Sequence, residues 1–308
     1  MAFFGLKTKG SQTSQVTENL EHFVNDFSIE VMPRTAEKIE DFRDHLPEST
    51  RVYIAHIEGT PIEDMVKTAK RLAKEGFPTM PHFPARIIKD KATLNEWISR
   101  YQGEAGVNQA LLLAGGVSKP HGDYDSSMSL LETGLFDKAN FKNIHIAGHP
   151  EGNKDIDPDG TTVNVDAALK WKQNYKSKTD AKMAIATQFA FEAGPIIEWA
   201  NSIKNAGIDI PIHIGIAGPA KLQTLIKFAI ACGVGPSLKV LQKRATDVKK
   251  LLLPYEPTEV LSQLADHKAN NPDFNIKSVH FFPLGGIKTN AKWVMENCGN
   301  AGIPVNQI

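Results

Sequence analysis

Cysteine is scarce in this sequence, and long apolar runs are absent. Its 308 residues include two cysteines, Cys232 and Cys298, and no CxxC pair, which argues against disulfides or a zinc site and favours reduced, packed thiols. No run approaches the roughly 18 apolar residues that cross a bilayer, and the apolar stretch near the N-terminus is too short for a signal peptide. We therefore expect a cytoplasmic protein with no membrane partner.

An excess of charge of one sign is also missing. Lys and Arg together number 35, and so do Asp and Glu. A balanced chain has no extended basic field, so we expect no nucleic-acid partner, and any anionic ligand must be held by local groups. With 41% hydrophobic residues, the chain can bury a large core as one α/β barrel or as two ordinary domains.

Short apolar runs alternate with amphipathic helical patterns along the chain, at a repeat of roughly 25 to 40 residues. This alternation is typical of consecutive βα units around a parallel sheet, and eight such units close into a barrel. We find no interdomain linker and no internal sequence repeat. The sequence therefore predicts an α/β fold, a single (β/α)8 TIM barrel over residues 1–308. The predicted strands are 28–32, 52–56, 79–83, 109–113, 143–147, 183–188, 211–216 and 278–282.

Two additions to the barrel are predicted. Residues 13–25 have the pattern of an extra N-terminal helix that caps the bottom of the barrel. The interval between the seventh and eighth strands is longer than the others, and residues 237–250 and 257–268 predict a helical insertion before the last strand. Barrel enzymes often place ligand contacts in that region.

Polar residues and glycines, which an apolar core would not favour, stand at the C-terminal ends of the predicted strands. These ends meet around one mouth, where barrel enzymes hold their active sites. We therefore expect the residues to converge on a single site. They are Glu30, His56, His82, Gly115–Gly116, His149 with Glu151, Gln188, His213 and Gly285–Gly286.

Glu30 is a lone carboxylate between Ile29 and Val31 in the first strand. Partial burial without a full counter-ion would raise its pKa toward the range of a general acid. Alternatively, Glu30 pairs with Arg34 or a lysine and closes the end of the barrel. Gln188 offers amide donors and an acceptor to the edge of a heteroaromatic ligand, or it is a buried hydrogen-bonding residue.

The histidines at the strand ends have no HxH pair and no clustered carboxylates beside them. We therefore expect no metal site, and a metal-dependent hydrolase is the minor alternative. Lys172 belongs to a basic stretch that contains Lys170, Lys176 and Lys178. This stretch either meets a cofactor phosphate or forms a solvated helix face.

Several short motifs follow one another in the order found in a known enzyme family. Ser28-Ile-Glu-Val-Met-Pro33 is similar to the family's Ser-Phe-Glu-Phe-Phe-Pro-Pro, and Ala186-Thr-Gln-Phe189 is similar to its Ile-Thr-Gln-Phe. Over about residues 27 to 300 the chain resembles the methylenetetrahydrofolate reductase family. The further matching segments are Pro81-His82-Phe83, His149-Pro150-Glu151-Gly152, 207–216, 228–236 and His280-Phe-Phe282.

The resemblance implies hydride transfer between NADH or NADPH, FAD at the barrel mouth and 5,10-methylenetetrahydrofolate, giving 5-methyltetrahydrofolate. Glu30 would be the general acid that protonates N10 of the folate. The protein would bind a folate substrate, and it could form a homo-oligomer. The substrate-binding residues implied are Gln188, Phe189 and Gln242. The cofactor-binding residues implied are Ala55, His82, Ala114, Gly115, Gly116, Tyr124, His149, Asn153 and Lys172.

Three segments depart from the family pattern. Leu113-Ala-Gly-Gly116 replaces Leu-Arg-Gly-Asp, whose Arg and Asp serve flavin binding; Asn153 replaces a histidine; and Leu284-Gly-Gly286 replaces Leu-Asn-Arg. The glycine amides form either replacement anion nests or tight turns only. Flavin could then bind normally or weakly, or hydride could pass directly between nicotinamide and folate. The chain could also be a folate-dependent methyltransferase or a non-catalytic folate binder.

Overall fold

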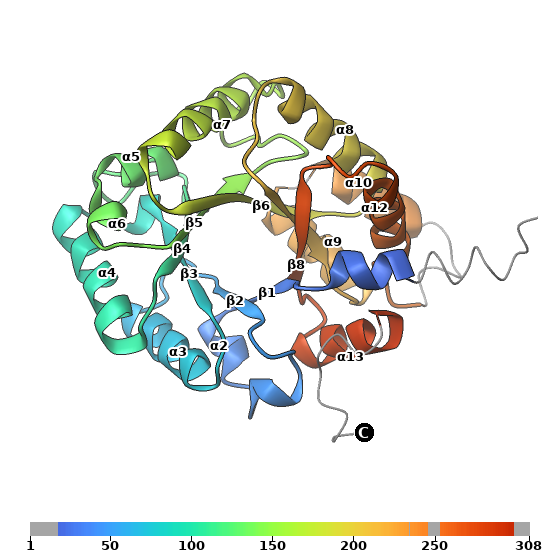
Figure 1. The fold of residues 1–308 in the computed structure, drawn as a ribbon, viewed down its shortest axis with the longest axis horizontal. Coiled ribbons are helices and arrows are strands. Elements are labelled where there is room, and N and C mark those ends of the chain that lie inside the picture. The colour runs from blue at the N-terminus through green and yellow to red at the C-terminus, as the bar shows by residue number, and fades with distance from the viewer. Residues whose placement is uncertain (1–17, 234, 246–252, 299–308) are drawn as a thin grey trace, which may run out of the picture.

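Eight parallel strands close into a barrel surrounded by helices in the computed structural model of the chain (Figure 1). The structure describes residues 18–233, 235–245 and 253–298. Each strand pairs with the one that precedes it, and β8 returns to pair with β1. The predicted (β/α)8 TIM barrel is therefore confirmed.

The strands lie within two residues of their predicted ends. Their bounds are β1 Ser28–Val31, β2 Arg51–Ile54, β3 Thr79–Pro84, β4 Gln109–Leu113, β5 Asn143–Gly148, β6 Lys182–Ala190, β7 Ile212–Ala217 and β8 Ile276–Phe282.

The helices follow the strands in alternation. Their bounds are α2 Pro33–Ala36, α3 Ile62–Lys74, α4 Lys91–Ala105, α5 Ser127–Glu132, α6 Leu135–Lys138, α7 Val163–Tyr175, α8 Ala193–Asn205, α9 Leu222–Ala231, α10 Gly235–Ala245, α12 Thr258–Asn270 and α13 Ile287–Cys298. Short 3₁₀ turns lie at η1 Phe42–Asp44, η2 Ala85–Ile87 and η3 Lys176–Lys178.

Local sequence signals fix the ends of these helices. The side chain of Asp90 caps α4 by accepting a hydrogen bond from the backbone N of Thr93 at 2.8 Å. Gly106 ends the same helix in the left-handed conformation, with φ of 64°, which glycine adopts without the steric cost that a side chain brings. Between these ends, Leu94 and Ile98 pack against the barrel.

Side chains of each strand alternate between the helical layer and the barrel interior. Outward-facing residues such as Ile29, Ile54 and Phe83 form the main hydrophobic core with the surrounding helices. Inward-facing positions carry polar groups instead, including Glu30 and His145. The interior of this barrel therefore combines buried polar groups with a small apolar cluster of Tyr53, Met80, Leu111 and Ala186, and the polar groups reach the candidate site.

The N-terminal helix is confirmed over the part that the structure describes. Residues 18–24 are helical, and Leu20, Phe23 and Val24 pack in the main core. Residues 13–17 of the predicted helix lie outside the described residues.

The helical insertion before β8 is also confirmed, but its extent differs from the prediction. Val260, Leu261 and Leu264 of α12 pack in the main core, and α12 packs against α8, so α12 is the regular barrel helix and not an added one. The inserted part is α9 with α10, which form a second apolar cluster with Phe189. Amphipathic patterns alone do not reveal which helix faces the sheet. Residues 246–250 of the prediction lie outside the described residues.

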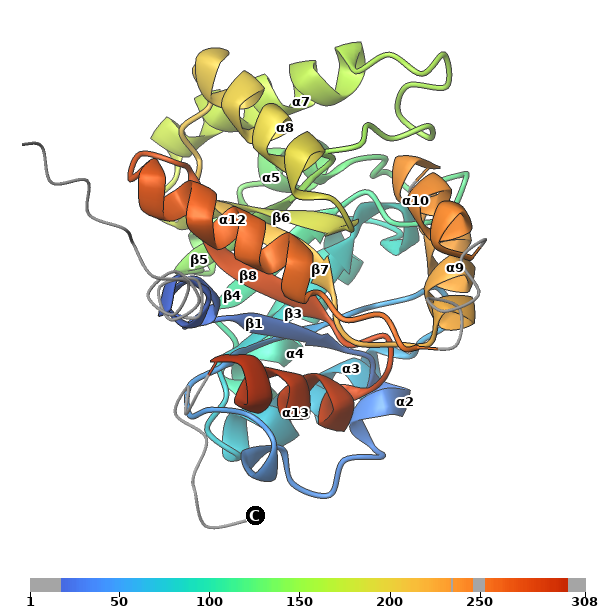
Figure 2. The same cartoon turned by 90° about the vertical axis from the view of Figure 1, so that its right-hand side faces the viewer.

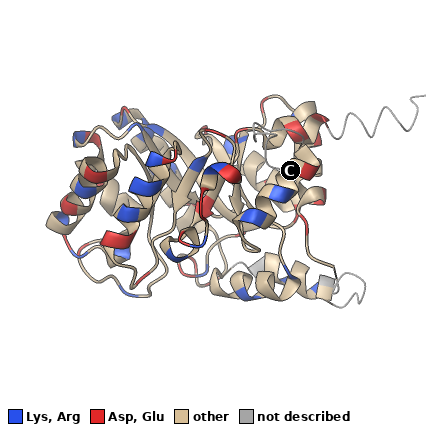
Figure 3. Cartoon of the chain, turned by 90° about the horizontal axis from the view of Figure 1, so that it is seen from below, with Lys and Arg blue, Asp and Glu red and all other residues tan. Residues whose placement is uncertain are grey.

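Figure 2 shows α9 and α10 beside the end of the barrel at which the strands finish. Lys and Arg lie beside Asp and Glu on the same helices (Figure 3), in keeping with the balanced charge of the chain. Within the described ranges, no helix combines the length and the apolar character required to span a membrane.

Candidate functional site

Glu30 on β1 meets two histidines inside the barrel. Its Oε2 lies 3.2 Å from Nε2 of His82 on β3 and 3.8 Å from Nε2 of His280 on β8. The Glu30 side chain is 19% exposed, whereas those of His82 and His280 are 9% and 1% exposed. Little water therefore screens the charges in this group.

The pKa of Glu30 is lowered to about 2. Burial is the largest influence and acts to raise this pKa, but the positive charge of His82, hydrogen bonding to both imidazoles and the charge of His280 together outweigh it. The expectation of a raised pKa is therefore wrong. The alternative partners Arg34 and lysine are wrong as well, because histidines from distant strands hold the carboxylate.

His280 is held in place by the first strand. Its Nδ1 shares a hydrogen bond of 3.0 Å with Oγ of Ser28, and both residues are buried. The ring of Tyr53 lies against the His280 ring, with centroids 4.2 Å apart. These contacts turn Nε2 of His280 toward Glu30.

The polar layer continues deeper into the barrel. The Tyr53 hydroxyl shares a hydrogen bond with Nδ1 of His145 on β5, and the His145 ring lies edge to face with that of His213 on β7, with centroids 4.7 Å apart. Burial lowers the pKa of His145 and lowers that of His213 to about 3. Both imidazoles are therefore neutral at pH 7.

Ser28, Tyr53, His145 and His280 were not predicted as members of the site. The available signal was their spacing, because polar residues at alternate positions of strands that should be buried on both faces mark the inward face. Ser28 and Glu30 have this spacing, as do Ser278 and His280.

A bulge in β6 places Gln188. The pairing of β6 with β7 shifts register between Ala186 and Phe189, and a bulge redirects the side chains near it. The backbone of Gly215 on β7 fits against this bulge, because an added Cβ would lie 2.4 Å from the carbonyl oxygen of Thr187 and 2.6 Å from that of Gln188. Oε1 of Gln188 is buried and has no hydrogen-bond partner among the described residues.

Cys232, at the end of α9, shows that Gln188 and Glu30 share one end of the barrel. The residue as a whole is exposed, yet desolvation of the thiol raises its pKa to about 11, and the negative charge of Glu30 acts in the same direction. A hydrogen bond with Gln188 acts in the opposite direction. The thiol therefore lies near both side chains, and α9 covers this part of the mouth.

Three predicted cofactor residues form a separate group outside the barrel interior. Nδ2 of Asn153 lies 3.5 Å from Nδ1 of His149, and Lys172 of α7 lines a narrow cavity with His149 and Trp199. Burial lowers the pKa of Lys172 to about 8 and that of His149 to about 4. The predicted solvated face for Lys172 is wrong, since this residue is 7% exposed.

The remaining predicted residues do not join either group. Tyr124 and Phe189 are buried in the two apolar clusters, and Gln242 is exposed on α10. Ala55 and Ala114 contribute backbone contacts, to Val31 and Arg86. His56, predicted at the mouth, is buried against Trp97 with ring centroids 4.8 Å apart.

Close packing explains two of the glycines that were predicted to form anion nests for FAD. Gly115 has φ of 96°, and a Cβ there would lie 3.0 Å from Cβ of Pro84, while a Cβ at Gly285 would lie 2.1 Å from the carbonyl oxygen of Pro219. Steric fit therefore accounts for these two glycines. Lys172 is the one lysine or arginine of the predicted set, and its cavity of about 20 Å³ has room for one water molecule. Flavin binding stays a prediction.

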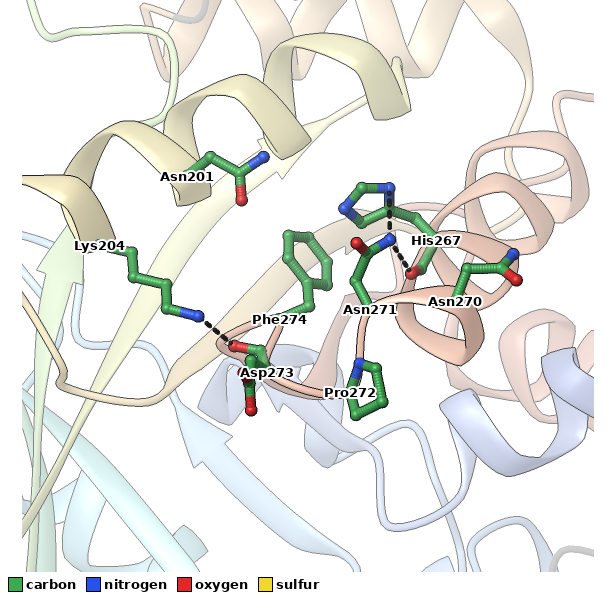
Figure 4. A pocket seen from close by; sticks show the side chains of 8 residues that line it. All are labelled: Asn201, Lys204, His267, Asn270, Asn271, Pro272, Asp273 and Phe274. Carbon is green, nitrogen blue, oxygen red and sulfur yellow. Dashed lines mark hydrogen bonds between the residues drawn. The ribbon is translucent and has the colours of Figure 1, made fainter.

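A larger cavity of about 390 Å³ lies between the C-terminal ends of α8 and α12, at the bottom of the barrel (Figure 4). Its polar groups engage one another: Nζ of Lys204 donates to the carbonyl oxygen of Asp273 at 3.0 Å, and Nδ2 of Asn271 donates to that of His267 at 2.8 Å. No predicted site residue lines it. In the described ranges, no three His, Cys, Asp or Glu side chains gather as a metal site would require.

No family model matches the chain, so the resemblance to the reductase family stays a prediction. The fold is similar to that of an uncharacterized protein from Clostridium thermocellum that binds two copies of 5-methyl-5,6,7,8-tetrahydrofolic acid. The similarity covers 92% of this chain and 98% of that chain, with a TM-score of 0.54 and 9% sequence identity. It shows that the two proteins share a fold.

Proposed function

We propose that the barrel mouth binds a reduced folate and that the protein interconverts 5,10-methylenetetrahydrofolate and 5-methyltetrahydrofolate with a nicotinamide as hydride carrier. One observation carries the proposal: the Glu30 carboxylate and the Gln188 side chain lie at the same end of the barrel. Oε1 of Gln188 is buried there and accepts no hydrogen bond from any described residue. Binding of 5-methyltetrahydrofolate by a protein of the same fold supports it.

The two side chains match complementary parts of a folate. The pterin ring presents N–H donors along its pyrimidine edge, and a buried acceptor such as Oε1 of Gln188 gains a hydrogen bond when it receives one of them. Glu30 is the group that would exchange a proton with N10 while hydride reaches the adjacent methylene carbon. Held by two buried histidines, its carboxylate is fixed in place before a substrate arrives.

Binding and turnover test the proposal separately. We expect saturable binding of 5-methyltetrahydrofolate in a calorimetric titration, and nicotinamide-dependent formation of methylenetetrahydrofolate. Glu30→Gln should retain binding and lose about 10²- to 10⁴-fold in kcat, whereas Gln188→Ala should weaken binding by about tenfold. The exposed residues Glu192 and Gln263 provide the controls Glu192→Gln and Gln263→Ala. A protein that binds no reduced folate contradicts the proposal.

Flavin participation is a separate question with a separate measurement. When bound, FAD would supply a hydride relay between nicotinamide and folate. A purified protein that absorbs at about 450 nm carries flavin, and a colourless protein that turns over with NADH or NADPH transfers hydride directly. The same preparation decides between the two.

The ionised state of Glu30 favours a second candidate, a folate-binding protein without hydride chemistry. A carboxyl group with a pKa of about 2 is not a proton donor by itself at neutral pH. Tight binding of 5-methyltetrahydrofolate without nicotinamide-dependent turnover would establish a binder, and methyl transfer without nicotinamide would establish a methyltransferase.

A further inference from the structure

A general acid must carry a proton before the reaction starts, and Glu30 does not. With its pKa lowered to about 2, the carboxyl group is ionised in nearly every molecule at neutral pH. If the protein performs the proposed reaction, the proton for N10 must therefore come from a group that the carboxylate contacts.

His82 is the contact that can supply this proton. Its Nε2 lies 3.2 Å from Oε2 of Glu30, which is the shorter of the two histidine contacts. This nitrogen is buried, and the Glu30 carboxylate is its ion-pair and hydrogen-bond partner. His280 is placed differently, since its Nδ1 is engaged by Ser28 and its Nε2 stands 3.8 Å from the carboxylate.

On the basis of the proposed function, we propose that His82 holds the proton that Glu30 passes to the folate, so that the donor is the Glu30–His82 pair. The N–H bond of the His82 imidazolium breaks as an O–H bond forms on Glu30. That O–H bond then breaks as N10 gains the proton. The N10–methylene bond breaks with its electron pair on N10, while the lone pair of N5 forms the double bond of an iminium, whose carbon then accepts the hydride of the nicotinamide. One proton leaves His82 and one arrives at N10, and solvent protonates His82 again. His82 is thus a positioning residue that acts through Glu30.

The other titratable groups around the pair come from each element that packs on it. On β8 there is His280, on β2 there are Arg51 and Tyr53, after β2 there is His56, and at the end of α9 there is Cys232. Burial lowers the pKa of His280 and of His56 and raises that of Tyr53 and of Cys232. Each of these shifts favours the uncharged form of its group.

The pH dependence of kcat for the reduction of 5,10-methylenetetrahydrofolate, the direction in which N10 gains a proton, distinguishes this role from a structural one. In the wild type, the Glu30–His82 pair carries the proton that the reaction uses. The charge of His82 is the largest influence that lowers the pKa of Glu30, and His82→Gln removes it, so the pKa of Glu30 rises. In this variant the proton is held by Glu30 itself, as a neutral carboxylic acid. The alkaline limb of the kcat profile should therefore move to lower pH. We expect about 10²-fold lower kcat at pH 8 and a loss of less than about tenfold at pH 5.

His267→Gln is the matched control, because it removes an imidazole that lines the cavity at the bottom of the barrel, at the other end from Glu30. It should keep the wild-type alkaline limb. His82→Ala provides a second variant, whose activity added imidazole should restore. An alkaline limb that does not move in His82→Gln, with kcat lowered equally at every pH, overturns the inference.

Binding of 5-methyltetrahydrofolate keeps this test separate from that of the proposed function. Both His82 variants should bind it within about threefold of the wild type, since the proton role changes kcat and not affinity. Normal binding and turnover with an unmoved limb overturn the role of His82 alone. A wild-type protein without folate binding or turnover overturns both proposals.

Discussion

Glu151, in the loop after β5, caps the N-terminus of α10 through Ser237. Its Oε2 accepts a hydrogen bond from the backbone N of Ser237 at 3.0 Å, and its Oε1 accepts one from the Ser237 hydroxyl. A carboxylate at this position satisfies free N–H groups and complements the positive end of the helix dipole. The contact fastens the α9–α10 insertion, which follows β7, to the loop that follows β5.

Removing this cap should loosen the insertion while the barrel remains folded. In Glu151→Ala the buried Ser237 loses both acceptors, which costs about 1 to 2 kcal/mol. Hydrogen exchange of α10 amides should accelerate by roughly 5- to 30-fold, while exchange in β1 to β8 is unchanged. Glu96→Ala, at an exposed position of α4, is the control. Unchanged exchange in α10 would show that the cap does not hold the insertion.

The barrel was predictable from the sequence, whereas the contacts of its interior were not. Alternation of apolar runs and amphipathic helices depends on short-range periodicity, which a sequence displays directly. The contacts of Glu30 depend on barrel closure, which brings His280 beside β1 although about 250 residues separate them. The sequence identified Glu30 and Gln188 as unusual. It could not identify the neighbours that lower the pKa of Glu30, because they are distant in the chain.

Gly215→Ala should disturb Gln188 from the neighbouring strand. The new methyl group would meet the carbonyl oxygens of Thr187 and Gln188 at 2.4 and 2.6 Å, and such backbone overlap costs about 1 to 3 kcal/mol or more. We expect lower stability in urea and weaker binding of 5-methyltetrahydrofolate. Gly103→Ala, within α4 and with open space around it, should instead stabilise by about 0.5 to 1 kcal/mol. Intact folate binding in Gly215→Ala would contradict the role of the bulge.

Lys172 destabilises the folded protein at neutral pH. Burial lowers its pKa from 10.5 to about 8, so between these values the unfolded chain binds more protons, and this group makes stability rise with pH. Below about pH 8 the buried ammonium lowers the free energy of unfolding by its full amount, which for this pKa shift is about 3 kcal/mol. Lys172→Met should recover most of it at pH 7, as measured by urea unfolding at pH 7 and 9. Lys170→Met, on the exposed face of the same helix, should have no such effect, and equal results for both would contradict the prediction.

His56 makes the fold sensitive to acid. Like Lys172, it makes the free energy of unfolding rise with pH, but in a lower pH range. Burial lowers its pKa from 6.5 to about 4, so between these values the unfolded chain binds more protons and stability falls as pH falls. The shift corresponds to about 3 kcal/mol lost between pH 6.5 and 4. His56→Phe keeps the ring packed on Trp97 but gives up the 3.0 Å hydrogen bond between Nε2 and the carbonyl oxygen of Thr60. It should therefore cost about 1 kcal/mol at pH 7.5 and become the more stable protein near pH 4. Urea unfolding between pH 4 and 7.5 measures this, and His22→Phe, at an exposed position, is the control. Equal losses of stability in the wild type and in His56→Phe as the pH falls would contradict the assignment.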